Sequence, residues 1–185
     1  MESVVGRETA ARWRRHLAVM PGILAAGLLL LPEPAASIGQ RSLSFYHTHT
    51  GKRLDVVYAR GGEYVESALE EVERFLSDFR TGDRKTIDPE LLDLLYELRE
   101  TLGSDGTFEV ISAYRSPKTN AMLRKRGSGV ARNSQHLAGK AIDVRLRDVS
   151  LVRLRDAAIA MERGGVGYYE ASNFVHLDTG RVRRW

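Results

Sequence analysis

Two short segments in the second half of the sequence show the two-residue periodicity of β-strands. They are residues 141–146 (AIDVRL) and 174–178 (FVHLD). Successive side chains of a strand point to opposite faces, so each segment predicts a strand with a core-facing side and a second side that carries polar groups. On this reading Asp143 and His176 point away from the apolar residues that precede and follow them.

The rest of the chain beyond residue 37 predicts both helices and strands. Residues 43–47 and 54–58 are strand-like and flank a Thr-Gly turn, which predicts a hairpin. Asp88 and Pro89 are typical of a helix start. The predicted helices are 63–80, 89–102, 117–126 and 151–163, the last closed by Gly164-Gly165, and the other predicted strands are 107–113 and 166–169. Helices early and strands late predict an α+β fold, with a mostly antiparallel sheet and flanking helices.

The composition narrows the chemistry that the chain can perform. Its 185 residues contain no cysteine, which excludes thiolate metal sites, thiol nucleophiles and disulfides. Any metal must therefore be held by His, Asp or Glu, and there are only five histidines. A net charge of +4, spread along the chain, does not indicate a nucleic-acid partner.

Residues 1–36 read as an export signal rather than as part of the fold. A basic start is followed by the apolar run 17–31 and by a segment rich in proline and alanine. The pair Arg14-Arg15 fits a twin-arginine signal, although such pairs also occur by chance in basic signal regions. No clear Ala-x-Ala cleavage site follows, so an uncleaved membrane anchor stays open. The domain expected to carry the function is 37–185.

His136 and Asp143 suggest a metal site. Gly139 lets the chain turn tightly before strand 141–146, so that His136 can fold back over Asp143. His176, on another strand, would complete a His-Asp-His set and leave a fourth position open, as in catalytic zinc sites. From spacing alone a turn that feeds a buried strand remains the simpler reading, because histidines in strands are usually hydrogen-bonded core or surface residues.

Several motifs along the chain resemble one family of zinc peptidases. The motifs are Ser134-x-His136-x-x-Gly139-x-Ala141-x-Asp143, Phe174-Val175-His176, residues 46–51 (YHTHTG), 111–117 (ISAYRSP), 165–169 (GVGYY) and 178–181 (DTGR). Over nearly the whole of 37–185 they are similar to the D-alanyl-D-alanine carboxypeptidase and murein endopeptidase group, most closely its YcbK-like branch. That group shares its fold with lysostaphin and sonic hedgehog.

The resemblance implies functional roles for four residues. His136, Asp143 and His176 match the family's zinc ligands. The arginine of the Tyr-Arg-Ser turn, here Arg115, faces the metal in relatives, where it can hold a carboxylate or stabilise an oxyanion. A purely structural Arg115, paired with a loop carboxylate, is the alternative.

The sequence departs from the family at the position of the general base. Many relatives have Glu or Asp three residues before the last zinc histidine, whereas this chain has Asn173. We expect Asp178, on the strand face of His176, to be the base, with Glu170 as the next candidate. Alternatively, Asp178 orients a metal ligand.

His47 and His49 could be mistaken for a second metal pair. They lie in the predicted hairpin, far in sequence from the other ligands, so we expect a structural or substrate-groove role. The leading interpretation is an exported zinc peptidase of the periplasm or cell envelope, acting on peptidoglycan peptides as an endopeptidase rather than a carboxypeptidase. The alternative is a non-catalytic zinc-binding module that recognises wall peptides or a partner protein. Residues 1–36 would give transient or permanent membrane association, and the sequence does not indicate an oligomeric state.

Overall fold

The computed structural model describes residues 39–127 and 130–185. The expected export signal or anchor, residues 1–36, lies outside the described residues. Within the described ranges, no helix is both long and apolar enough to cross a membrane.

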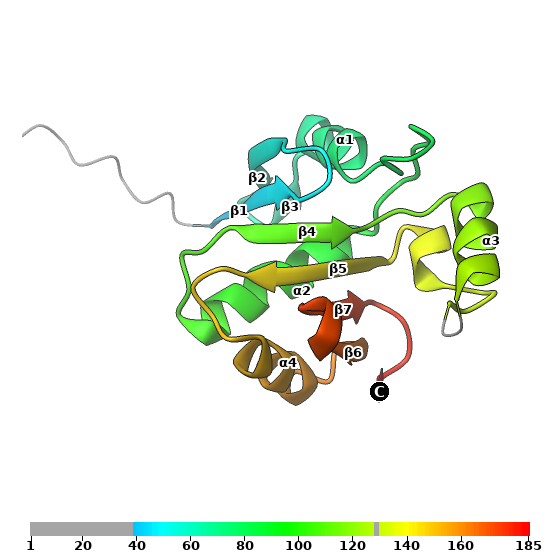
Figure 1. The fold of residues 1–185 in the computed structure, drawn as a ribbon. Helices are drawn as coiled ribbons and strands as arrows, with labels where there is room; N and C mark the ends of the chain where they lie inside the picture. Colours follow the sequence, from blue (N-terminus) through cyan, green and yellow to red (C-terminus); the bar gives the residue numbers. More distant parts are fainter. Residues whose placement is uncertain (1–38, 128–129) are drawn as a thin grey trace, which may run out of the picture. The chain divides into compact units, whose positions relative to one another are not determined.

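One eight-stranded sheet runs through the described part of the chain, in the order β3-β2-β1-β4-β5-β7-β6-β8 (Figure 1). Five of its seven strand pairs are antiparallel, and β1·β4 and β6·β8 are parallel. The predicted α+β class with a mostly antiparallel sheet is therefore confirmed. The strands are β1 (Gln40–His47), β2 (Arg53–Arg60), β3 (Glu63–Tyr64), β4 (Phe108–Ser112), β5 (Ala141–Leu146), β6 (Gly165–Tyr169), β7 (Phe174–Asp178) and β8 (Arg183–Arg184).

Helices α2 and α3 begin where the local signals predict them. Asp88 caps α2 by accepting a hydrogen bond from Glu90, and Ser116 caps α3 by accepting one from Thr119. Both helices begin with a proline, whose fixed φ suits the first helical position. The α-helices are α1 (Glu66–Phe75), α2 (Pro89–Leu102), α3 (Pro117–Arg126) and α4 (Leu151–Ala160), and η1 (Gln135–Ala138) and η2 (Glu170–Ser172) are short 3-10 helices.

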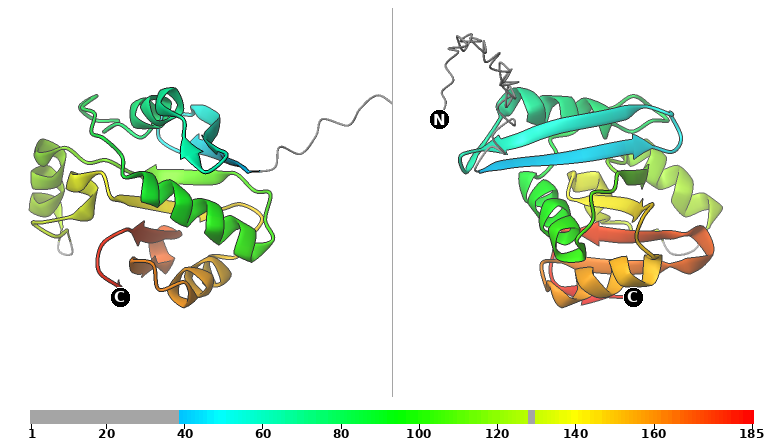
Figure 2. Two further views of the ribbon diagram at one scale, coloured as in Figure 1. Left: turned by 180° about the vertical axis from the view of Figure 1, so that it is seen from behind. Right: turned by 90° about the vertical axis from the view of Figure 1, so that its left-hand side faces the viewer.

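The core lies between the sheet and helices α1, α2 and α4; α1 contacts β2, and α2 contacts α4 and β1. Figure 2 shows α2 in front of the strands when the molecule is seen from behind. Strand residues with the core periodicity, such as Phe108, Val110, Ile142 and Val144, are fully buried there. The alternate residues point to the other face of the sheet, and this face carries the candidate site.

Two predicted helices are shorter in the structure. The segment 63–80 was expected to be one helix, but it forms strand β3 and then α1, which ends at Phe75. The carboxylate of Asp78 accepts hydrogen bonds from the backbone of Arg80 and of Ser116, and these contacts hold the chain in a turn. Phe79 is thereby free to stack on His49, with ring centroids 4.3 Å apart.

Helix α4 was predicted to run to residue 163 but ends at Ala160. Glu162 has a φ of 51°, in the left-handed region, so the helix cannot continue through it. The Gly164-Gly165 pair therefore does not cap α4. Gly164 instead packs against the backbone of β7, where a Cβ would lie 1.8 Å from the carbonyl oxygen of Asp178.

Candidate metal centre

The three candidate ligands come from η1, β5 and β7. Ser134 caps η1 by accepting a hydrogen bond from the backbone of His136. Gly139 ends η1 with a φ of 72°, and a Cβ there would lie 2.2 Å from the carbonyl oxygen of Thr86. Only glycine satisfies both conditions. The tight turn at Gly139 therefore returns the chain into β5 with His136 over the end of the sheet.

Strands β5 and β7 pair so that Asp143 lies directly opposite His176. Directly opposite residues on one face are the closest side-chain neighbours in an antiparallel sheet. Asp143 Oδ1 is 2.9 Å from His176 Nδ1 and 3.3 Å from His136 Nε2, and the two imidazole nitrogens are 3.2 Å apart. The three residues are 3%, 5% and 7% exposed, in chain order.

The donor set fits a zinc ion. Zinc bonds to imidazole nitrogen and carboxylate oxygen are about 2.0–2.2 Å long, so ligand atoms at the corners of a tetrahedron are roughly 3.3–3.6 Å apart. The three observed separations, 2.9 to 3.3 Å, come within a few tenths of an ångström of that spacing. In the part of the chain that the structure describes, these three residues form the only His/Cys/Asp/Glu group close enough to bind one ion.

The ring nitrogens that face away from the cluster are also bonded. His136 Nδ1 lies 2.7 Å from the carbonyl oxygen of Ala113, so it carries the proton and leaves Nε2 as a lone-pair donor. His176 Nε2 lies 2.8 Å from Asp178 Oδ2, which likewise leaves Nδ1 free to bind a metal. Such outer contacts orient metal-binding imidazoles and increase their basicity.

Asp178 is fully buried and has no spare acceptor position. Its Oδ2 accepts from His176 and from Arg183 Nη2, at 2.8 and 2.6 Å. Its Oδ1 accepts from Arg183 Nη1 and from the backbone of Gly165 and Gly180. These contacts fit the alternative role of orienting His176, while the assignment of Asp178 as general base stays a prediction.

Both aspartates of the centre are ionised. Burial alone would raise the pKa of Asp143, but in the absence of a metal the attraction to His136 and hydrogen bonds from protonated imidazole nitrogens lower it well below its usual range; a bound metal would take the place of those protons. Burial opposes ionisation of Asp178 too, and the hydrogen bonds from His176 and Arg183 again lower its pKa. Burial would lower the pKa of His176, but the bonds to the two carboxylates raise it.

Arg115 lies beside the cluster, as the resemblance implies. Its Nη2 is 3.6 Å from Asp143 Oδ2 and 3.4 Å from Ser112 Oγ. Its Nε is buried without a hydrogen-bond partner among the described residues. Arg115 also lines the cavity beside the cluster, so its guanidinium can meet a ligand there.

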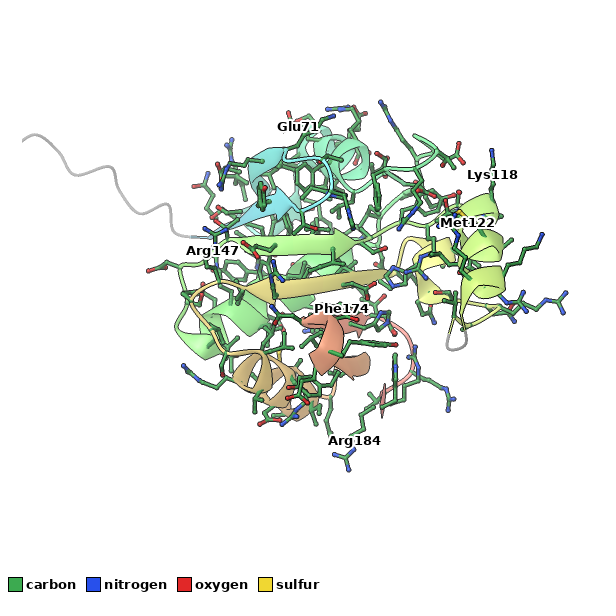
Figure 3. All side chains as sticks on the ribbon, viewed as in Figure 1. Glu71, Lys118, Met122, Arg147, Phe174 and Arg184 are labelled. Atoms are coloured by element: carbon green, nitrogen blue, oxygen red, sulfur yellow. The ribbon has the colours of Figure 1, made fainter. Side chains whose placement is uncertain are left out.

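The cluster lies at the bottom of a cavity of about 570 Å³. Figure 3 draws the described side chains and labels Phe174, one of the residues that line the cavity. Asp143 has the only side-chain carboxylate among the described residues that line the cavity. The lining residues are Arg115, Val130, Ala131, Asn133, Ser134, Gln135, His136, Asp143, Tyr169, Phe174, His176, Arg183 and Trp185.

Neither Glu170, the next candidate for the base, nor Asn173, at the family's usual base position, is among the described residues that line the cavity. Asn173 occupies the usual base position, and its φ of 53° explains the residue type, because asparagine tolerates the left-handed region. It is exposed and caps the end of η2. Glu170 is exposed at the start of η2 and is not among the described residues that line the cavity.

Comparison with known proteins agrees with this geometry. A family model described as peptidoglycan L,D-endopeptidase MepK matches residues 35–185. The chain belongs to this family. It is 40% identical to the peptidoglycan L,D-endopeptidase MepK of Escherichia coli (strain K12) over 176 residues, which is 93% of this chain and 96% of the relative. The probable peptidoglycan L,D-endopeptidase MepK of Haemophilus influenzae is 38% identical over 169 residues, 89% of this chain and 91% of the relative. The predicted membership of a murein endopeptidase branch is thus confirmed.

The two histidines of the hairpin, His47 and His49, lie outside the metal cluster. His47 is 1% exposed, and its ring contacts Phe75 and Phe79 edge-on. Its Nδ1 accepts a hydrogen bond from the backbone of His49. Burial lowers the pKa of His47 from 6.5 to about 4, so the ring is neutral. These contacts fit a structural role.

Sequence analysis gave no role to several residues of the cavity, among them Tyr169, Arg183 and Trp185. A signal for them exists in strand β6. Its sequence Gly-Val-Gly-Tyr-Tyr places Gly165 and Gly167 on the same face as Tyr169. A Cβ at Gly167 would lie 2.7 Å from the ring of Trp185, so the glycine makes room for this ring. Glycine at alternate positions of a strand indicates that another group packs closely on that face.

Proposed function

We propose that this chain is a zinc-dependent peptidase that hydrolyses a peptide bond in the cross-links of peptidoglycan. The observation that carries the proposal is the buried His136–Asp143–His176 cluster at the bottom of an open cavity, in a chain of the MepK family. The relatives are named as L,D-endopeptidases, which favours cleavage inside a cross-link over trimming of a free end.

Three residues of the chain would hold the zinc ion. His136 and His176 would each offer a neutral imidazole nitrogen, and Asp143 a carboxylate oxygen, to zinc. When bound at such a site, zinc supplies polarisation of a carbonyl group and activation of water. Its three protein ligands leave a coordination position for the substrate side, which is typical of catalytic rather than structural sites.

Arg115 would stabilise negative charge beside the metal. Its guanidinium is held near Asp143 and lines the cavity, where a charge-assisted hydrogen bond to a negatively charged oxygen is strong. Burial lowers the pKa of Arg115, and attraction to Asp143 opposes this change. An arginine remains cationic under these conditions. We therefore assign it to the oxyanion or to a substrate carboxylate.

Asp178 would act through His176. It fixes the ring orientation by accepting the Nε2 proton, and Arg183 holds the carboxylate in place through two hydrogen bonds. The proton acceptor for the attacking water is not evident among the described cavity residues, because Asp143 has their only side-chain carboxylate. This observation keeps the zinc-binding module without catalysis as the second candidate.

The two parts of the chain, residues 1–36 and 37–185, would have separate roles. Residues 1–36 would direct export to the periplasm or cell envelope, by the twin-arginine or the general route, and the peptidase would comprise 37–185. Peptidoglycan lies outside the cytoplasm, so an enzyme that cuts it must be exported.

A cleavage assay tests the proposal. Full-length protein would be incubated with cross-linked and linear muropeptides, and the products analysed by mass. We expect cross-links to be cut, a chelator to stop the reaction, zinc to restore it, and H136A to be inactive. No cleavage of any muropeptide by zinc-loaded protein, with binding retained, would favour the second candidate.

A further inference from the structure

We propose that Trp185 forms an apolar subsite that receives the aliphatic side chain of a residue next to the scissile bond. This inference rests on the proposed peptidase function and adds a substrate contact to it. The ring of Trp185 lines the cavity and is 51% exposed. Large apolar side chains this exposed are few in the described part of the chain, and the other three (Tyr64, Val152 and Val182) do not line this cavity.

The exposed ring is held rigidly. Its Nε1 donates to Tyr169 Oη at 2.8 Å, and the guanidinium of Arg183 lies 5.0 Å from its centroid. The backbone of Trp185 is bonded on both sides, to the carbonyl oxygen of Val166 and the N–H of Tyr168. Gly167 leaves the space that the ring occupies. A tryptophan that is fixed but still half exposed presents a preorganised apolar surface, and little entropy is lost when a ligand covers it.

Neighbouring aromatic rings extend this surface. Tyr169 stacks on Phe174 with centroids 4.6 Å apart and an interplanar angle of 21°. Both rings line the same cavity as Trp185. The two residues of β8, which precede Trp185, place their side chains differently. Arg183 lines the cavity, while Arg184 points away from the sheet (Figure 3). One wall of the cavity is thus aromatic.

The distance to the metal cluster identifies which part of a substrate meets this wall. The ring of Trp185 lies 5.2 Å from the ring of His176, centroid to centroid. Adjacent Cα atoms in a peptide are about 3.8 Å apart, so a peptide whose scissile carbonyl lies at the cluster places a flanking side chain over Trp185. Sugar rings of a glycan strand are farther from that carbonyl along the chain. The group that meets Trp185 therefore belongs to the peptide, and the exposed apolar ring suits the aliphatic part of a side chain.

Fluorescence gives a direct test, because the whole chain has only two tryptophans, Trp13 and Trp185. In full-length Trp13→Phe protein loaded with zinc, all tryptophan emission comes from Trp185. The probe is a sugar-free, cross-linked stem-peptide dimer whose scissile amide is reduced, so that it binds without being cut. We expect a saturable change in emission. No change at concentrations that inhibit cleavage overturns the proposal, and a change caused only by peptide-free glycan oligosaccharides overturns it in favour of a sugar site.

Kinetics on the sugar-free dimer separate binding from support of the fold. We expect Trp185→Ala to raise KM at least about 10-fold with a smaller effect on kcat, because a rigid aromatic anchor contributes uniform binding. Trp185→Phe should recover part of the loss, and Arg184→Ala, the matched control on the same strand, should resemble wild type. Zinc content should be unchanged in all three variants. An unchanged KM in Trp185→Ala, or a fall in kcat that parallels zinc loss, overturns the proposal.

A matched ligand pair makes the test specific to the side chain. The probe is prepared again with the side chain of the residue that supplies the scissile carbonyl shortened to that of alanine, which leaves the cross-link itself intact. In wild type this change should weaken inhibition, and in Trp185→Ala it should have little further effect, since contacting groups are not additive. Equal weakening in both proteins overturns the proposal. Wild-type cleavage without any Trp185 effect refutes the subsite alone, whereas probe binding without cleavage refutes the peptidase and leaves the subsite standing.

Discussion

Replacing Asp178 with asparagine separates its two possible roles. The carboxylate of Asp178 accepts five hydrogen bonds, and every group around it is therefore a donor. Two bonds come from Arg183, one from His176 and two from backbone N–H groups. An amide NH₂ therefore meets a donor in either orientation. If it faces His176, the imidazole loses its acceptor, and if it is flipped, it faces Gly165 and Gly180.

The size of the effect follows from the bond that is lost. The His176–Asp178 bond is 2.8 Å long and has a charged acceptor, a type that contributes about 1.5–3 kcal/mol. Loss of an outer partner of a metal-binding histidine typically lowers metal affinity about 10–100-fold, or roughly 1.4–2.7 kcal/mol. The two values agree, so we expect Asp178→Asn to weaken zinc binding by one to two orders of magnitude.

Competition with a chromophoric zinc chelator measures this affinity directly. Asp93→Asn is the matched control, because Asp93 also accepts three side-chain hydrogen bonds, from Arg41, Tyr58 and Tyr64, in another part of the fold. It should lower the melting temperature without changing zinc affinity. If Asp178→Asn binds zinc as tightly as wild type but loses about 10²–10⁴-fold in rate, Asp178 is the general base and our account of it is refuted.

Four further predictions follow from the same contacts. Elemental analysis should find one zinc per wild-type chain and much less in H136A or H176A, whereas changing His47 and His49 together should not alter it. Arg115→Ala should keep its zinc and lose about 10²–10³-fold in kcat, as is typical when an oxyanion donor is removed, and unchanged kcat would support a structural arginine. The pKa of His47 is lowered from 6.5 to about 4, so its contribution to stability is full above 6.5 and is lost as the pH falls towards 4; urea unfolding of His47→Leu should show a smaller loss over that interval than wild type. A chain that starts at Ser37 should fold and bind zinc, and Lys at positions 14 and 15 should stop export of a fused reporter if the twin-arginine route operates.

Local signals predicted the elements that local interactions determine. Helix α3 has the predicted bounds because Ser116 and Pro117 define its start through contacts within one turn. Strands β5 and β7 were found from their alternation, and their pairing brings Asp143 opposite His176. The residue-by-residue ligand set came from the family resemblance, since spacing alone did not distinguish a metal site from a buried polar pair.

The predictions that were wrong concern segments whose structure depends on contacts with residues far away in the sequence. The helix expected over 63–80 stops at Phe75, because Asp78 bonds to Ser116, 38 residues away. Trp185 enters the cavity through pairing of β8 with β6, and the alternate glycines of β6 indicate that a group packs there without identifying it as Trp185. The sequence analysis interpreted Asn173 only as the loss of a base. Its positive φ gives a second reason for the residue type, because asparagine tolerates this conformation.

Anomalous diffraction at the zinc absorption edge from zinc-loaded crystals tests the central claim most directly. Our account predicts one strong peak bonded to His136 Nε2, His176 Nδ1 and an Asp143 oxygen, at about 2.0–2.2 Å. The bond between His176 Nε2 and Asp178 should persist in that crystal. A peak at His47 and His49 instead, or zinc-loaded protein that cuts cross-links with no metal at this cluster, would contradict it.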